Sequence, residues 1–265
     1  MIYKFCTRTD PGRTRENNED AVAYDESTGL TILADGMGGY NAGEVASSMA
    51  TDLIRAEMSR WLSEVGSRVT TRDIRHALEI SVDNANRAVY SAAAANTKYA
   101  GMGTTLVVGV FHQNRLVVGH IGDSRCYRFR NGELVQITRD HSLLQEQIDA
   151  GLITPQQAAT SVNRNLVTRA LGVEAEALLE LNEYVVEGEE TYLMCSDGLS
   201  DMVPDADIAK ILNSQDGLGQ KADHLVAQAN ANGGRDNITV LLVQAGGKLE
   251  KRGLISRWLG KVVTS

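Results

Sequence analysis

Two patterns of hydrophobic and polar positions alternate along the chain, and each predicts one type of element. Runs rich in apolar and β-branched residues predict strands, and several of these runs are near-continuous, as expected for strands covered on both faces. These runs are 21–25, 30–35, 104–111, 115–123, 125–130, 133–138, 191–197 and 238–244. Apolar residues at helical spacing predict amphipathic helices. The two long helices are expected over 43–62 and 71–96, and shorter ones at about 142–150, 155–161, 205–213 and 219–231.

Short connections join several of the predicted strands. Residues 112–114 link two runs, and Asn131-Gly132 links two others, which is a strong hairpin signal. Loops this short require antiparallel neighbours, so the pattern excludes a parallel Rossmann-type sheet. Groups of strands separated by long helices indicate an α+β layered fold, and we expect one domain over residues 1–245.

The charge and cysteine content narrow the possible partners and compartments. The 265 residues include 26 basic and 34 acidic side chains, a net charge of −8, which disfavours nucleic acid as a partner. The sequence shows no apolar run near the roughly 18 residues of a transmembrane segment, and its first residues lack the apolar core of a signal peptide. Cys6, Cys126 and Cys195 are far apart, as in free thiols of a reducing compartment. We expect a cytoplasmic monomer.

The last stretch, residues 246–265, differs in character from the rest. It holds five basic residues against one acidic residue. Its apolar residues lie near helical spacing, at Leu254, Ile255, Trp258, Leu259 and Val262. We interpret this basic, amphipathic C-terminal extension as a docked helix, and the alternative is a tail that binds a membrane surface or a partner.

Carboxylates stand where the predicted strands end or begin. Three strands end at Asp35, Asp123 and Asp197. The pair Glu19-Asp20 and the residue Asp236 come just before two other strands. In an antiparallel sheet the end of one strand lies beside the start of its neighbour, so these acids are expected to converge on one rim.

Such a rim needs positive charge. Carboxylates gathered without comparable Lys or Arg repel one another, which raises their pKa values. Hard divalent cations resolve the repulsion because they prefer carboxylate, carbonyl and water oxygens. Two ions roughly 3.5–4 Å apart activate water and orient a phosphoryl group. Zinc is disfavoured because the histidines His76, His112, His120, His141 and His224 show no ligand spacing. The alternative is that each Asp-Gly pair is an ordinary turn.

Six short motifs share their order and approximate spacing with one family. They are RENNED (15–20), ADGMGG (34–39), GTT (103–105), IGDSR (121–125), SDG (196–198) and GRDN (234–237). On these motifs, about residues 1–245 resemble the metal-dependent serine/threonine phosphatases of type 2C, in their compact bacterial form. The resemblance implies two antiparallel β-sheets in a central sandwich flanked by pairs of α-helices. It also implies hydrolysis of phosphoserine and phosphothreonine in proteins by direct attack of a metal-bridging hydroxide, counteracting a eukaryotic-like Ser/Thr kinase.

The resemblance also assigns roles to individual residues. Asp35 is expected to bridge two Mn²⁺ or Mg²⁺ ions, and the Gly36 carbonyl to complete the second site. Asp197 and Asp236 are expected to hold the first ion, and Asp123 to share a third ion with Asp197. Asp20 and Glu19 are expected to act through metal-bound waters. Arg15 is expected to grip the substrate phosphate with its planar fork of donors, and Asn237 to orient Asp236. The catalytic set is therefore Arg15, Asp35, Asp197 and Asp236.

Two departures from the family pattern affect the expected chemistry. Met37 stands where eukaryotic members often carry a histidine that can act as general acid, so no catalytic histidine is assigned. Residues 141–172 resemble the flap of bacterial members, but Ser161-Val162 replaces an expected His-Pro pair. Flap-dependent substrate choice is therefore not predicted.

Two other function classes are weighed against the phosphatase. A non-catalytic binding module with this fold would have lost metal ligands, and none of the expected ligands is missing. A two-metal phosphodiesterase or nuclease would need a basic, aromatic groove, which the net charge of −8 and the sequence pattern oppose. The phosphatase is the favoured prediction.

Overall fold

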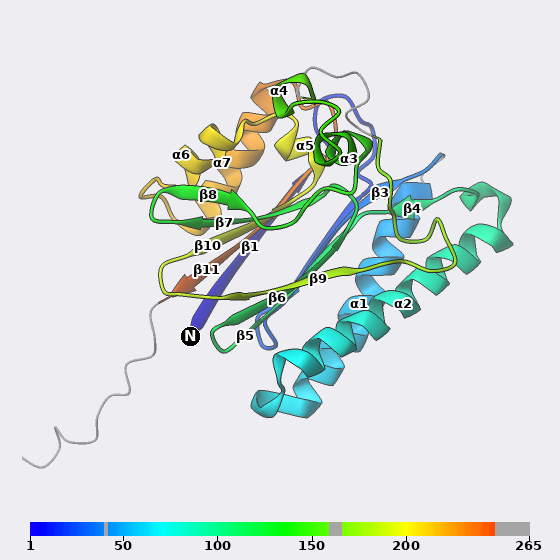
Figure 1. Cartoon of the computed structure of the whole chain (residues 1–265), viewed down its shortest axis with the longest axis horizontal. Helices are drawn as coiled ribbons and strands as arrows, with labels where there is room; N and C mark the ends of the chain where they lie inside the picture. The colour runs from blue at the N-terminus through cyan, green and yellow to red at the C-terminus, as the bar shows by residue number, and fades with distance from the viewer. Residues whose placement is uncertain (40–41, 159–165, 247–265) are drawn as a thin grey trace, which may run out of the picture.

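The computed structural model describes residues 1–39, 42–158 and 166–246. Two antiparallel sheets lie face to face, and helices cover their outer faces (Figure 1). This confirms the predicted α+β sandwich with four layers. The C-terminal extension from residue 247 onward and the Ser161-Val162 pair of the flap lie outside the described residues.

The first sheet has five strands in the order β1-β11-β10-β7-β8. All its paired neighbours are antiparallel. Its strands are β1 (Ile2–Asp10), β7 (Arg125–Arg130), β8 (Glu133–Gln136), β10 (Thr191–Cys195) and β11 (Ile238–Gly246). The Asn131-Gly132 turn joins β7 to β8, as the sequence predicted.

The second sheet follows the order β2-β3-β5-β6-β9, and the short strand β4 also pairs with β3. Its strands are β2 (Asp20–Asp25), β3 (Leu30–Met37), β4 (Gly103–Thr104), β5 (Leu106–His112), β6 (Arg115–Ile121) and β9 (Glu180–Val185). These pairs are antiparallel too, so the short 112–114 connection forms a hairpin as expected.

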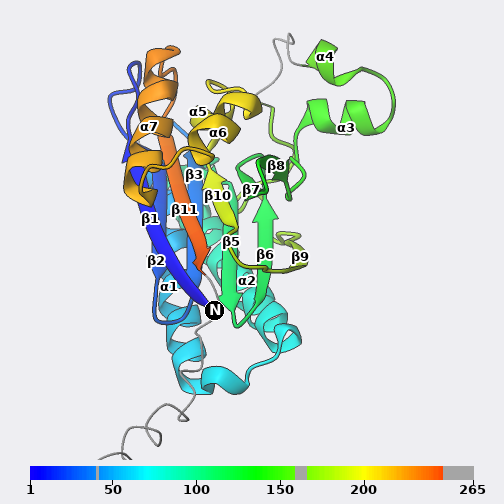
Figure 2. The same cartoon turned by 90° about the vertical axis from the view of Figure 1, so that its left-hand side faces the viewer.

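The helices divide between the two outer faces. The long helices α1 (Ala42–Val65) and α2 (Thr71–Ala95) run side by side along the second sheet, and α6 (Asp205–Leu212) and α7 (Leu218–Ala231) cover the first sheet (Figure 2). Thr70 and Asp73 form a reciprocal capping box that begins α2. The shorter helices are α3 (Leu143–Asp149), α4 (Pro155–Ala158) and α5 (Asp197–Ser200), with 3₁₀ turns at η1 (Gly66–Arg68) and η2 (Thr97–Tyr99).

Three hydrophobic layers hold the sandwich together. One layer joins α1 and α2 to the second sheet and includes Ile54, Leu78 and Val108. The middle layer lies between the sheets and includes Phe111 and Tyr192, whose ring centroids are 5.3 Å apart. The third joins the first sheet to α5, α6 and α7. Because the inner strands are covered on both faces, they appear in the sequence as near-continuous apolar runs.

The structure corrects several predicted boundaries. The run 104–111 is two strands, because the regular backbone pairing with β3 is interrupted at Thr105. The Thr105 amide still donates to the Asp35 carbonyl, but the Asp35 amide donates to the Thr105 hydroxyl. The run 115–123 ends at Ile121, where Gly122 turns with φ of +101°. Strands β1 and β9 were not predicted at all. In the part of the chain that is described, no helix is both long enough and apolar enough to cross a bilayer.

Candidate active site

Five of the six acidic residues singled out in the sequence line one cavity of about 290 Å³, and the sixth, Asp20, lies behind it, paired with Asp35 in the sheet. Five acids and one arginine line it, together with small and apolar residues. The lining residues are Arg15, Glu19, Asp35, Gly36, Met37, Gly38, Thr105, Asp123, Val167, Asp197 and Asp236. A neighbouring hollow of about 230 Å³ shares Arg15, Asp197 and Asp236 with it.

Both sheets contribute to this cavity from the same end. Asp35 lies near the end of β3 in the second sheet, and Asp20 begins β2 directly opposite it. Asp197 follows β10 of the first sheet and begins α5, and Asp236 precedes β11. The structure therefore brings acids that end strands and acids that begin strands to one rim.

Asp35 is fixed through its backbone by a buried threonine. The Asp35 amide donates to Thr105 Oγ1 (3.0 Å), and the Thr105 amide donates to the Asp35 carbonyl (2.8 Å). Thr105 Oγ1 also lies 2.7 Å from Ser124 Oγ. Burial raises the pKa of the Asp35 carboxyl well above its ordinary value, and the charges of Asp20 and Asp197 raise it further. Asp35 is thus held in place while its charge is left uncompensated.

Asp20 is buried beside Asp35 and is only partly satisfied. Ser196 Oγ donates to Asp20 Oδ2 at 2.8 Å. The other oxygen, Oδ1, is buried and has no hydrogen-bond partner among the described residues. Burial raises the pKa of Asp20 from 3.8 to about 6. A buried carboxylate oxygen without a donor is a group that a bound water or cation would satisfy.

Asp197 and Asp123 are a second pair of acids whose pKa values are raised by burial and by neighbouring negative charge. Burial raises the pKa of Asp197 well above its ordinary value, and Asp123 is the strongest of the neighbouring charges that add to the shift. Burial also raises the pKa of Asp123 to about 6, with Asp140 the next cause. Arg125 offsets only part of this shift, because its guanidinium is engaged with Asp140 through three contacts of 2.7–3.1 Å.

These observations test whether the residues fit divalent cations. Carboxylate oxygens line the cavity, the orphaned Asp20 oxygen lies next to Asp35 behind it, and Arg15 is the one cationic side chain among the lining residues described. Proteins resolve such an excess of buried negative charge by binding hard cations through oxygen ligands. The donor set therefore fits Mg²⁺ or Mn²⁺.

Arg15 lies at the mouth of the cavity and pairs with Asp236. Its Nη2 is 2.9 Å from Asp236 Oδ2, and about half of the Arg15 side chain is exposed. The guanidinium thus keeps donors available to solvent close to the acidic rim. An exposed planar fork beside a polar cavity suits the binding of an anion such as phosphate.

The side chain of Asn237 holds the loop that carries Glu19, whereas its backbone amide contacts the carboxylate of Asp236. Its side-chain oxygen accepts from the Glu19 amide (2.8 Å), and its Nδ2 donates to the carbonyls of Pro11 (3.1 Å) and Asn17 (2.8 Å). The contact with Asp236 comes from the Asn237 backbone amide, which donates to Oδ1 at 2.9 Å. The expected orienting contact is present, but the side chain serves the 11–19 loop.

Gly36 is a glycine because two other backbones pass close to it. A Cβ at this position would lie 2.1 Å from the Gly43 carbonyl oxygen and 2.6 Å from that of Glu19. The Gly36 amide donates to the Glu19 carbonyl at 3.1 Å. This close packing sets the start of α1 against the Asp35 strand end, and it leaves the Gly36 backbone on the cavity wall.

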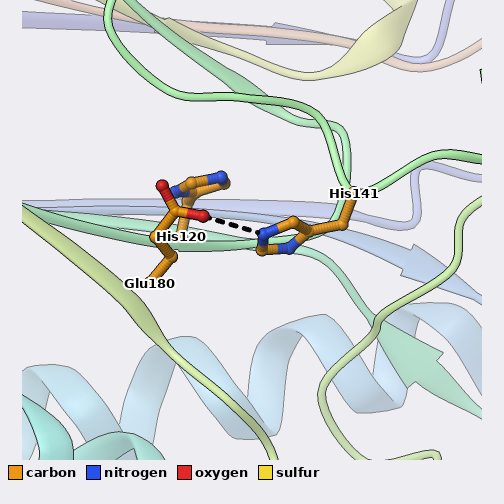
Figure 3. Close-up of side chains that lie close together, drawn as sticks. All are labelled: His120, His141 and Glu180. Carbon is orange, nitrogen blue, oxygen red and sulfur yellow. Dashed lines mark hydrogen bonds and ion pairs between the residues drawn. The ribbon is translucent and has the colours of Figure 1, made fainter. Parts of the chain in front are cut away.

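One cluster of histidines outside the cavity could not be predicted from their spacing in the sequence. His120 and His141 stack with ring centroids 4.6 Å apart, and Glu180 lies beside them (Figure 3). Each of the three offers a ligand atom within 4.8 Å of the others. Thr105 was also missed, although the GTT motif contains it, because no local pattern shows that its hydroxyl reaches Asp35.

Comparison with protein families places this site in context. The family model described as protein phosphatase 2C matches residues 12–230. The chain is 40% identical over 242 residues to a serine/threonine phosphatase named Stp from Listeria innocua, and the match covers 89% of this chain and 94% of the relative.

Solved structures give the same result in three dimensions. The serine/threonine phosphatase PstP/Ppp of Mycobacterium tuberculosis superimposes with a TM-score of 0.86 at 36% identity, over 93% of this chain and 100% of that one. A catalytic domain of serine/threonine protein phosphatase PstP in complex with two manganese ions superimposes with a TM-score of 0.82, also at 36% identity, over 93% and 99% of the two chains.

Proposed function

Since the chain belongs to the protein phosphatase 2C family, we infer that it is a metal-dependent serine/threonine protein phosphatase. Its substrates are phosphorylated proteins, and its cofactors are divalent cations such as manganese. The observation that carries the inference is the cavity itself, in which buried carboxylates with raised pKa values face one exposed arginine.

We assign the roles of holding cations to the acids at this end of the sheets, here called the acidic rim: Glu19, Asp20, Asp35, Asp123, Asp197 and Asp236. Asp35, Asp197 and Asp236 are proposed as direct ligands, with the Gly36 carbonyl. Asp20 and Glu19 are proposed to act through water. Asp123 is proposed to help hold a third ion. When bound, a pair of such cations lowers the pKa of coordinated water and neutralises phosphate charge. The orphaned Asp20 oxygen and the repulsion between Asp35 and its neighbours support this assignment.

Arg15 is proposed to bind the substrate phosphate. Its guanidinium pairs with Asp236 at 2.9 Å, so phosphate oxygens replace that carboxylate as acceptors when the substrate arrives. Met37 lines the cavity and carries no acidic proton, and no histidine is among the lining residues described. The leaving serine or threonine oxygen therefore takes its proton from a group other than a histidine of this cavity.

A larger groove beside the acidic cavity suits a polypeptide rather than a small phosphate ester. A groove of about 620 Å³ adjoins the cavity and shares Met37 and Val167 with it. Residues that flank a phosphoserine or phosphothreonine would lie in this groove. This continuity supports protein substrates.

The proposed function also implies a cellular setting. A protein phosphatase needs a kinase that phosphorylates its substrates, so we propose a bacterial Ser/Thr kinase as its partner in signalling. Free thiols and the absence of a helix that could span a bilayer in the described chain are consistent with a cytoplasmic location. The whole cavity is built from residues of one chain, within 1–245, which supports a monomeric catalytic domain.

Phosphate release from a phosphothreonine peptide tests the function. The wild-type protein is assayed with Mn²⁺ and with chelator, beside Asp197→Asn. Activity is expected only for the wild type with Mn²⁺. Asp52→Asn is the matched control, because Asp52 is an exposed aspartate of α1 that pairs with Arg55. A folded protein that binds Mn²⁺ and releases no phosphate would overturn the proposal.

A further inference from the structure

His141 lies at the base of the 141–172 flap, outside the acidic cavity but bonded to the loop that carries Asp123. Its side chain is buried, and it stacks on buried His120 (Figure 3). Glu180 of β9 pairs with His120 of β6 in the sheet and reaches across to His141. None of the three residues lines the cavity.

The hydrogen bonds of His141 determine which nitrogen carries its proton. The Gly122 backbone amide donates to His141 Nδ1 at 3.2 Å. A backbone amide can only donate, so Nδ1 is unprotonated and the proton of the neutral ring is on Nε2. Nε2 lies 3.3 Å from Glu180 Oε2 and donates to it. Glu180 therefore orients the ring so that Nδ1 faces Gly122.

The same proton assignment disfavours a metal site here. A metal at His141 would need the lone pair of Nε2, because Nδ1 already accepts the Gly122 amide. The ring would then have to lose its last proton. His120 Nε2 is engaged with the Arg139 carbonyl at 2.7 Å. The three groups thus form a hydrogen-bonded cluster, although their spacing resembles that of metal ligands.

His141 bonds to both the amide and the carbonyl of Gly122, and it also bonds to the segment around Thr168 at the base of the flap. Its amide donates to the Gly122 carbonyl (2.9 Å), in addition to the side-chain contact with the Gly122 amide. Its carbonyl accepts from the Thr168 amide (2.8 Å), next to Val167 of the cavity wall. On its other side Gly122 packs against Thr105, and a Cβ there would lie 2.8 Å from Thr105 Cβ.

We propose that His141, oriented by Glu180, is a positioning residue that fixes the Gly122–Asp123 loop and so places the Asp123 carboxylate beside Asp197. Gly122 turns with φ of +101° immediately before Asp123, so its two bonds to His141 define the direction of the Asp123 side chain. The proposal rests on the phosphatase function proposed above, in which Asp123 holds a cation.

The electrostatic surroundings keep His141 in the form that this role needs. Burial lowers the pKa of His141, and the neighbouring His120 and Arg169 lower it further, while Glu180 opposes them. The ring is therefore neutral near pH 7, and Nδ1 stays available to the Gly122 amide. Protonation would place a second donor against that amide and break the contact.

Two substitutions separate the two hydrogen bonds of the ring. His141→Asn places an amide oxygen near the position of Nδ1, where it accepts from Gly122 but cannot reach Glu180. His141→Gln places its amide near Nε2, where it donates to Glu180 but leaves the Gly122 amide unpaired. The two are assayed with Glu180→Gln, for Mn²⁺ binding by calorimetry and for kcat and KM on a phosphothreonine peptide. Asp123→Asn defines the part of Mn²⁺ binding that depends on Asp123.

His141→Gln is expected to weaken the Asp123-dependent Mn²⁺ binding and kcat by about 10-fold or more, as loss of an orienting partner does. The Mn²⁺ affinity and kcat of His141→Asn are expected to stay closer to those of the wild type. Glu180→Gln is expected to fall between the two His141 variants. The proposal is overturned if His141→Gln matches or exceeds His141→Asn in Asp123-dependent Mn²⁺ binding and in kcat. The volume of the side chain, rather than its bond to the Gly122 amide, would then explain why the site needs His141. It is also overturned if Zn²⁺ binds stoichiometrically and His120→Ala abolishes that binding. Failure of the wild type to release phosphate would refute the proposed function, while the Mn²⁺ titrations would still test the role of His141.

Discussion

Arg15 and Asp236 form an ion pair at the mouth of the acidic cavity, with Arg15 Nη2 2.9 Å from Asp236 Oδ2. Arg15 comes from the loop after β1 and Asp236 from the loop before β11, so two adjacent strands of the first sheet supply the pair. If Arg15 binds the substrate phosphate as proposed, the phosphate and the Asp236 carboxylate compete for the same guanidinium donors.

Replacing Arg15 is expected to weaken substrate capture. Arg15→Ala removes a charged hydrogen-bonding group worth about 1.5–3 kcal/mol, which corresponds to about a 10- to 150-fold loss in kcat/KM. The loss should come mainly from KM, measured on a phosphothreonine peptide. Arg15→Lys keeps the charge without the planar fork and should recover only part of it. Mn²⁺ binding by calorimetry should be unchanged, and a large loss of Mn²⁺ affinity would assign Arg15 a different role.

Mn²⁺ is expected to stabilise the folded protein, and Asp35→Asn to remove that effect. Asp35 is buried among like charges, so the substitution should raise the melting temperature in chelator. In the wild type, Mn²⁺ at 100 times its Kd adds about 2.7 kcal/mol, or roughly 5–10 °C. Asp52→Asn should behave as the wild type does. An Asp35→Asn variant that melts lower in chelator and still responds fully to Mn²⁺ would contradict the assignment.

The stability of the metal-free protein is expected to fall as the pH rises. Burial raises the pKa values of Asp20 and Asp123 from 3.8 to about 6. Between about pH 4 and 6 the folded chain therefore binds more protons than the unfolded chain, and stability is lost as the pH rises through that window. Thermal unfolding in chelator should show this slope, and Asp20→Asn should flatten it. Added Mn²⁺ should reverse it, because cations bind the deprotonated carboxylates. A flat profile in chelator would mean that the acids are compensated in another way.

Gly36→Ala is expected to be strongly destabilising. The added Cβ would lie 2.1 Å from the Gly43 carbonyl oxygen, and neither backbone can yield without moving α1 from the strand end. We expect a loss of about 3 kcal/mol in the free energy of unfolding, measured in urea. Gly39→Ala is the control, because a Cβ there meets no described atom within 4 Å, and it should stay within about 0.5 kcal/mol. Equal stability of the two variants would show that α1 shifts freely.

The strands that sequence patterns missed are both edge strands. Strand β1 ends the order of the first sheet and β9 that of the second. Their sequences, IYKFCTRTD and ELNEYV, mix polar with apolar residues, because parts of these strands face solvent. Inner strands such as β5 and β10 are buried along almost their whole length and were predicted from continuous apolar runs. Burial on both faces makes a strand easy to predict, whereas of the half-exposed edge strands only β2 and β8 were predicted.

The same limit applies to the site. Asp35, Asp123 and Asp197 could be predicted because a carboxylate that follows an apolar strand is unusual in its local context. Thr105 and His141 could not, because each acts through a backbone amide that is distant in sequence, at Asp35 and at Gly122. Hydrogen bonds of this kind depend on the register of strands and on the path of loops, which no local spacing encodes.

The acidic rim draws Asp35 from one sheet and Asp197 and Asp236 from the other, with the aromatic contact of Phe111 and Tyr192 in the layer between them. Neither sheet alone carries a complete set of acids, so the distances across the rim depend on how the two sheets slide and tilt against each other. Substitutions that repack Phe111, which does not line the cavity, should therefore alter turnover if they move one sheet against the other. The packing between the two sheets therefore controls the geometry of the acids at one end of the sandwich.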